Sequence, residues 1–357
     1  MSRLTQPEIQ KQREYESILS GILSPTTTND RIKQSEQLLK ELEVKALPDL
    51  INCIIISLNA HAFTGLQFES ATNPEYRQLS ATILYRTLCK EKYDEVNCRM
   101  YHHWDKLPDF IRGRVLEGLI NFIETENTSL IMNQVFYAAA CLMKIIIESN
   151  GQWPQLYMLL SSFTPFSGDG RPIVTNDTAL NILKAFKMYT QLANEVMNGM
   201  GQYTQNICAL VNIFLELNPQ DPRVEIDEEF LNDIKDEAFM TGTGILKYTS
   251  FDRRKGNNCD RMIVNMLCHT EYLGNKSLAE GGDGVEKHLA VALNSFIDVF
   301  WFRPREVKLI VRRLLGFLMA FISKTSRAQG IILSTFIDNY SIFLFNPYHL
   351  SLSFVWV

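Results

Sequence analysis

Hydrophobic residues recur along this chain at intervals of three and four, the spacing that lines one face of an α-helix. The run from Leu47 to Leu58 is the clearest case, because its apolar positions form a broad stripe directly after a proline. Polar and charged residues occupy the other faces. No alternation of apolar and polar residues long enough to predict a β-strand interrupts this pattern. The chain is therefore predicted to be all-α.

The predicted helices are separated by short polar segments and follow one another in pairs. Asn29 or Asp30 is expected to cap the second helix. Polar loops are expected at about 61–73 and 89–106. The expected helices lie at about 7–23, 30–42, 48–58, 74–88, 108–124, 130–147, 154–163, 176–197, 202–217, 228–248, 260–273, 285–301, 305–323 and 328–345.

Prolines mark the start of one helix pair after another. Pro7, Pro48, Pro108 and Pro154 each open an apolar run, at intervals of 41, 60 and 46 residues. Proline suits the first helical turn because the missing N–H would have no partner there. HEAT and armadillo helix pairs repeat every 40–47 residues or so. The pattern predicts an α-solenoid of HEAT-type antiparallel helix pairs, with the polar segment 89–106 as the insertion in the long repeat.

Length, composition and charge agree with an extended repeat protein. The chain has 357 residues, of which 46% are hydrophobic and 21% charged. A single hydrophobic core seldom serves more than about 250–300 residues, whereas a repeat array has no such limit. The formal net charge of −5 disfavours general nucleic-acid binding and permits basic protein partners. We predict no direct nucleic-acid partner.

The cysteines, the first residues and the lengths of the apolar runs indicate the cellular compartment of the protein. Seven cysteines form an odd set without short paired spacings, which favours a reduced cytoplasmic or nuclear protein. The first residues, MSRLTQPEIQKQREYE, lack the apolar core of a signal peptide. No uninterrupted apolar run reaches about 18 residues, so no membrane insertion is predicted.

Motifs of catalysis and of metal binding are missing from the sequence. His102-His103, with Cys89 and Cys98 upstream, match no common zinc spacing, and we interpret them as surface or loop residues. Cys259 and the pair Cys268-His269 receive the same interpretation. The segments GTGILK and GGDGVE lack the Lys-Ser/Thr of a phosphate-binding loop. We predict a protein that is not an enzyme and that has no cofactor and no metal.

Three segments carry a resemblance to a known family. They are NPEYRQLSATILYRTLCKEKYDEV, KLPDFIRGRVLEGLINFIETE and ESNGQWPQLYMLLSSF. Together with SILSGILSPTTTNDRIKQSEQLLKEL, in which Ser24-Pro25 joins two helices, they resemble the N-terminal HEAT repeats of the importin-β (karyopherin-β) superfamily. The likeness covers about residues 15–163 and is nearest to the importins that carry ribosomal proteins and histones.

The resemblance implies a nuclear transport receptor of the cytoplasm, the nucleus and the nuclear pore. Such receptors bind the GTPase Ran in its GTP form on their N-terminal repeats. They also bind phenylalanine–glycine nucleoporins and, further along, protein cargo, which here would be basic. An export receptor of the same superfamily and a HEAT-repeat scaffold without a transport role are the alternatives.

The candidate Ran-binding residues lie on the second helices of the first two expected repeats. They are Lys33, Glu36, Lys40, Arg77, Gln78 and Arg86. The alternative is that these charges form an ordinary solvated face. In that case Arg77 and Arg86 would brace adjacent repeats by bonding to helix C-terminal carbonyls.

The sequence suggests three segments. Residues 1–163 are the importin-like repeats, with the Ran-binding region, and residues 164–345 are further helical repeats. Residues 346–357 form an apolar tail, although a solenoid requires a polar end. Either the tail folds back on the last repeat or the chain is a shortened form of a longer protein, and we favour the second.

Overall fold

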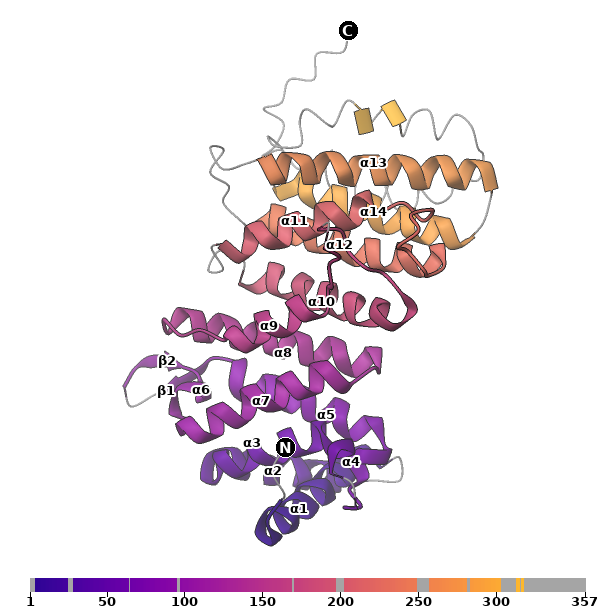
Figure 1. Ribbon diagram of the computed structural model, residues 1–357. Coiled ribbons are helices and arrows are strands. Elements are labelled where there is room, and N and C mark those ends of the chain that lie inside the picture. Colours follow the sequence, from indigo (N-terminus) through magenta and orange to yellow (C-terminus); the bar gives the residue numbers. More distant parts are fainter. Residues whose placement is uncertain are drawn as a thin grey trace. The chain divides into compact units, whose positions relative to one another are not determined.

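The computed structural model is helical, as predicted. It describes residues 4–24, 28–63, 65–94, 97–168, 170–196, 202–248, 257–280, 283–302, 313–314 and 316–317 (Figure 1). Fourteen α-helices and one small two-stranded sheet occur among these residues. The prediction of an all-α chain is confirmed. The chain divides into two compact units, Met1–Thr164 and Pro165–Val357, which we call unit 1 and unit 2.

Unit 1 contains seven helices of eight or more residues, with shorter turns between them. Helix α3 contacts α1, α2, α5 and α7, α5 contacts α8, and α7 contacts both α8 and α9. Most of these helices thus pack on a sequence neighbour and on a helix of an adjacent pair (Figure 1). The helices are α1 (Gln6–Leu23), α2 (Asn29–Lys45), α3 (Leu47–Leu58), α4 (Glu69–Thr72), α5 (Pro74–Leu84), α6 (His103–Lys106), α7 (Asp109–Thr125), α8 (Ser129–Glu148) and α9 (Pro154–Ser162).

The starts of these helices follow the chemistry of their first turns. Helices α1, α3, α5 and α9 each have proline in the first two positions, where a missing N–H costs nothing. Helix α2 differs from the prediction: its N-cap is Thr28, whose hydroxyl accepts from the Arg31 N–H, and Asn29 is already helical. A threonine cap was not distinguishable from the two polar residues after it, because all three are good caps.

The core of unit 1 is built from the apolar stripes of α3, α7 and α8. Ile51, Ile54 and Leu58 are fully enclosed, as are Leu119 and Phe122. Burial of a side chain of this size stabilises the fold by roughly 1.5–3 kcal/mol. Helix α8 is long and apolar enough to cross a membrane, but 67% of its apolar window is buried inside the protein. Such burial is typical of a core helix.

The polar segment 89–106 contains a short β-hairpin, so the prediction that this segment is a loop is wrong at this point. Strands β1 (Lys92–Asp94) and β2 (Arg99–Tyr101) are antiparallel, with Tyr93 opposite Met100. Three residues per strand are too few for a readable alternation of apolar and polar positions. A π-helical turn, η2 (Tyr85–Cys89), continues α5 and leads into the hairpin.

Unit 2 contains five described helices of 15 or more residues. They are α10 (Asn176–Glu195), α11 (Gln202–Glu216), α12 (Glu228–Tyr248), α13 (Asn257–Glu280) and α14 (Asp283–Phe302). Helix α12 contacts α10 and α14, while α11 contacts α12 and α13. Helix α13 is longer than expected at both ends. Helix α12 begins after Asp227, whose carboxylate accepts from the Phe230 N–H.

The last predicted elements lie beyond the part of the chain that the structure describes. Of the expected helix at 305–323, only residues 313–314 and 316–317 are described, and these are helical. The expected helix at 328–345 and the apolar segment 346–357 fall wholly outside the described residues.

Candidate partner-binding site

The charged face of α2 forms one wall of a hollow on unit 1. Glu36, Lys40 and Glu43 follow one another at helical spacing, so they share a face. The adjacent face, which carries Ser35, packs on α1, where a methyl group at Gly21 would overlap the Ser35 side chain. Ser35 lies about 100° around the helix from Glu36, so the charged face stands to one side of this contact.

The other wall comes from the end of α5 and the segment after it. The π-helical turn η2 carries Arg86, and Lys90 follows one turn later. Lys92, the first residue of β1, completes this wall. π-Turns inside helices occur frequently at functional sites. The hairpin that sequence analysis missed thus contributes a side chain to the site.

The hollow between these walls has a volume of about 270 Å³. We call it the basic hollow. Leu39, Leu50 and Ile83 supply apolar surface, and Leu50 and Ile83 are buried. The charged residues that line the hollow are Glu36, Lys40, Glu43, Arg86, Lys90, Glu91 and Lys92. An apolar base with a charged rim is a common form of site for a protruding side chain of another protein.

One of the acidic groups of the basic hollow is already neutralised. The Glu43 carboxylate lies 2.8 Å from Lys92 Nζ and 3.4 Å from His103 Nδ1. Burial lowers the pKa of His103 despite the nearby Glu43, so the imidazole is neutral at pH 7. Lys92 is therefore the charged partner of Glu43.

Three cations of the basic hollow remain available to a partner. Lys40, Arg86 and Lys90 are exposed and form no ion pair with any residue that the structure describes. Two acidic groups without a described cation partner, Glu36 and Glu91, also line the basic hollow. The basic hollow therefore favours a carboxylate-bearing surface, and an exposed cation reaches such a partner with little desolvation cost.

Three of the six candidate residues from the sequence meet in the basic hollow. They are Glu36, Lys40 and Arg86. The other three lie elsewhere: Lys33 is exposed on α2, Gln78 is half-buried on α5, and Arg77 is in a buried ion pair. Lys90 and Lys92 were missed, because a polar stretch read as a loop gives no hint of which side chains converge.

Arg77 has a structural partner. The guanidinium of this α5 residue pairs with the Glu126 carboxylate at the end of α7, and both side chains are largely buried. Glu126 also accepts from the N–H groups of Asn127 and Thr128. Burial raises the pKa of Glu126, but the Thr128 bonds and the Arg77 charge outweigh it and hold that pKa below its usual range. Arg77 thus braces two helices, through a carboxylate rather than through helix-end carbonyls.

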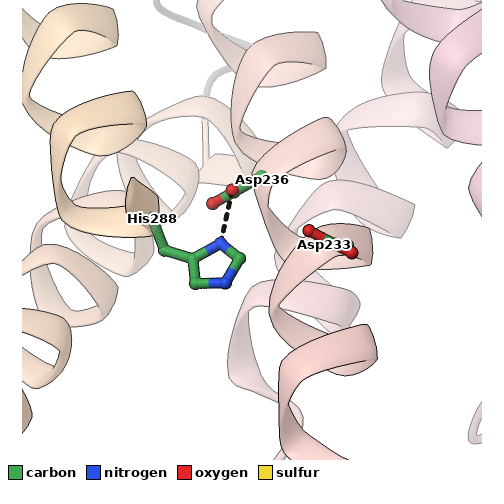
Figure 2. A group of neighbouring side chains, drawn as sticks. All are labelled: Asp233, Asp236 and His288. Carbon is green, nitrogen blue, oxygen red and sulfur yellow. Dashed lines mark hydrogen bonds and ion pairs between the residues drawn. The ribbon is translucent and has the colours of Figure 1, made fainter. Parts of the chain in front are cut away.

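A group of side chains in unit 2 was also missed. Asp233 and Asp236 of α12 lie near His288 of α14, with their ligand atoms within 4.8 Å of one another (Figure 2). The His288 Nδ1 lies 2.6 Å from an Asp236 oxygen, and Lys287 Nζ lies 3.2 Å from Asp233. Because each carboxylate already has a partner, the group acts as a clamp between α12 and α14.

Two interpretations of unit 2 residues need correction. His269 was expected at the surface, but it lies on α13 with 4% of its surface exposed. Cys259 is likewise buried, and its sulfur lies 3.8 Å from that of Cys208 on α11. Both lie on the buried face of a helix longer than the one the sequence predicted. No metal-ligating arrangement forms around either residue within the described part of unit 2.

No protein-family model matches the chain, and a search of curated proteins finds no match.

Proposed function

We propose that this protein is a nuclear transport receptor of the importin type that binds Ran in its GTP form through the basic hollow. The observation that supports this most is the convergence of Glu36 and Lys40 on α2 with Arg86 after α5. The resemblance to importins points to the same two segments, as the second helices of two successive repeats.

The chemistry of the basic hollow suits a protein partner better than a small molecule. Three of its four cations, Lys40, Arg86 and Lys90, are exposed at the rim, above apolar side chains. Unpaired cations at a rim accelerate association with an acidic surface and help to select the partner. On this proposal Lys40, Arg86 and Lys90 contact carboxylates of the GTPase.

The helix packing of each unit supports a repeat architecture. In unit 1, α3 packs on α1 and on α5 and α7, and in unit 2, α12 packs on α10 and α14. Contacts between every second helix are those of stacked antiparallel pairs. We propose that these pairs are HEAT repeats, that phenylalanine–glycine nucleoporins bind to them, and that the net charge of −5 favours basic protein cargo.

An export receptor and a HEAT-repeat scaffold remain the alternative functions. An export receptor binds cargo and Ran together, whereas an importin releases cargo when Ran-GTP binds. The effect of Ran-GTP on cargo affinity, positive or negative, therefore distinguishes the two kinds of receptor. A scaffold would not distinguish the two nucleotide forms of Ran.

A pull-down with immobilised Ran tests the proposal. The full chain is incubated with Ran locked in its GTP form or its GDP form, and the retained protein is quantified. Selective retention on the GTP form supports a transport receptor. Equal or absent retention on both forms overturns the proposal and favours the scaffold. Adding a basic cargo protein then separates import, in which retention falls, from export, in which it rises.

A further inference from the structure

A second cavity lies in unit 2, at the C-terminal end of α11. Its volume is about 320 Å³, within the range of ligand sites in proteins. It is lined by residues 215–219, by Lys235 of α12 and by four residues of α13. We call it the lysine pocket. Its distinctive feature is a pair of deeply buried side chains, Lys235 and His269, that have few partners.

Lys235 is a buried cation without a counter-ion. It has 4% of its surface exposed, and its Nζ donates one hydrogen bond, 2.6 Å long, to the Leu217 carbonyl oxygen. No carboxylate of the described residues pairs with it. Glu228, on the same helix, is engaged by Lys276 Nζ at 2.5 Å and by the Tyr272 hydroxyl at 2.6 Å. A buried ammonium is costly unless an anion accompanies it, so the pocket favours an anionic ligand.

His269 supplies a second unused polar group. The ring makes no hydrogen bond with any described residue, and its Nε2 is enclosed, which leaves Nδ1 as the nitrogen that a ligand can reach. It stacks on Tyr272 with ring centroids 6.4 Å apart. Burial, with the Lys235 charge, lowers the pKa of His269 to about 3. The imidazole is therefore neutral at pH 7 and has one N–H to donate.

The Glu216 carboxylate and the Asn265 amide of the pocket wall are already engaged. Glu216 accepts two bonds from Arg261 and one from Asn265. The Asn265 amide also donates to Asn212. The uncompensated charge of the pocket is thus the single positive charge of Lys235. One cation and one neutral donor suit a carboxylate, whereas a phosphate dianion is usually met by several cations.

We propose that the lysine pocket binds a carboxylate attached to a small apolar group. Lys235 serves as counter-ion, His269 donates a hydrogen bond to the carboxylate, and Leu215 and Pro219 contact the apolar group. Such a carboxylate belongs either to a free organic acid or to the C-terminus of a peptide. This site lies wholly in unit 2 and does not depend on the function proposed for unit 1.

Calorimetric titration of the full chain with three probes tests this. The probes are isovalerate, N-acetyl-leucine and N-acetyl-leucinamide, which resemble a free acid, a peptide C-terminus and the same group without charge. Saturable binding of either acid at millimolar concentration, without binding of the amide, supports the proposal. Tighter binding of N-acetyl-leucine than of isovalerate assigns the pocket to peptide termini, and the reverse order assigns it to free acids. Equal binding of acid and amide, or no binding, overturns it.

Two lysine variants test whether the acid binds in the lysine pocket. Lys235→Met keeps the length of the side chain and removes the charge, so acid binding should weaken about tenfold or more, a loss typical of a buried charge contact. Lys287→Met removes a charge elsewhere in unit 2, where Lys287 pairs with Asp233 at the surface, and should bind as the wild type does. Unchanged binding by Lys235→Met overturns the proposal.

If Lys235→Met does not fold, the pH dependence of acid binding by the wild type tests the proposal instead. Acid binding should fall between about pH 7 and 9.5 as Lys235 loses its proton, and binding that is constant over this range overturns the proposal. The fall should persist in Cys268→Ser and Tyr272→Phe. The titratable groups around Lys235 are Glu216, Glu228, Cys268, His269 and Tyr272.

Discussion

Arg77 and Glu126 form an ion pair that ties α5 to the turn between α7 and α8. The relative exposure of the two side chains is 13% and 6%, and the Glu126 carboxylate at the same time accepts from the N–H groups of Asn127 and Thr128, just before α8. A single carboxylate thus fixes both α5 and the turn that leads into α8. An arginine that sequence analysis selected as a partner contact is part of the internal structure.

Arg77→Ala should therefore destabilise unit 1 strongly. The substitution leaves Glu126 buried without its counter-ion, which costs on the order of 3–5 kcal/mol. Arg112→Ala is the matched control, because Arg112 pairs with the exposed Asp109 on the same helix and such pairs contribute about 1 kcal/mol or less. Chemical denaturation of both variants measures the difference. Equal losses in the free energy of unfolding would show that the buried Arg77–Glu126 pair stabilises unit 1 no more than an exposed pair does.

Two glycines of α7 should respond to alanine with opposite signs. A methyl group at Gly118 would overlap Ile55 of α3, whereas a methyl at Gly113 would meet no atom within 4 Å. Gly113→Ala should stabilise the protein by about 0.5–1 kcal/mol, and Gly118→Ala should destabilise it by about 1–3 kcal/mol through overpacking. Thermal unfolding of the pair reports on the close contact of α3 and α7. The contact is refuted if Gly118→Ala is as stable as Gly113→Ala.

Acid should weaken the contact between α1 and α7. Glu8 accepts from the Thr5 N–H and from Arg114 Nη1 at 2.7 Å. Burial raises the pKa of Glu8, but these bonds and the Arg114 charge outweigh it and lower the pKa to about 2. A carboxyl with a lowered folded-state pKa stabilises the fold above its unfolded pKa, and this stability is lost as pH falls through the folded value.

Glu8→Gln removes this titration. Between about pH 4.5 and 2, the free energy of unfolding should fall less steeply with acid in Glu8→Gln than in the wild type. Denaturant titrations at several pH values give both slopes, and identical slopes would argue against the ion pair with Arg114.

Raising the pH above neutrality should increase the free energy of unfolding through Lys235. Burial lowers the pKa of Lys235 to about 8 in the folded protein, while the unfolded chain retains a value of about 10.4. Between these values the unfolded state binds more protons, so stability should rise with pH, by up to roughly 3 kcal/mol. Lys235→Met should lack this rise. A rise of the same size in the variant would show that Lys235 is not its source.

The sequence predicted the helices better than the side-chain clusters, for a physical reason. Helix α3 was expected at about 48–58 and lies at Leu47–Leu58, because burial on one face imposes a spacing that can be read locally. The pairing of Asp236 with His288 joins residues 52 positions apart. Nothing local encodes it, since it depends on how α12 and α14 pack.

The candidate site was predictable to the extent that it lies on regular helices. Glu36 and Lys40 are one turn apart on α2, so their common face follows from helix geometry. Lys92 reaches the basic hollow only because β1 turns back after α5. The burial of His269 follows from the packing of a helix whose ends the sequence did not define.

The most direct test of the central claim is the affinity of Ran-GTP for charge variants of the basic hollow. The double variant Lys40→Glu/Arg86→Glu should bind Ran-GTP at least tenfold more weakly than the wild type, mainly through slower association and more so at low salt. Lys33→Glu alters the same helix outside the hollow and should bind as the wild type does. Wild-type affinity in the double variant, with GTP-selective binding intact, would contradict the assignment of the basic hollow as the Ran-binding site.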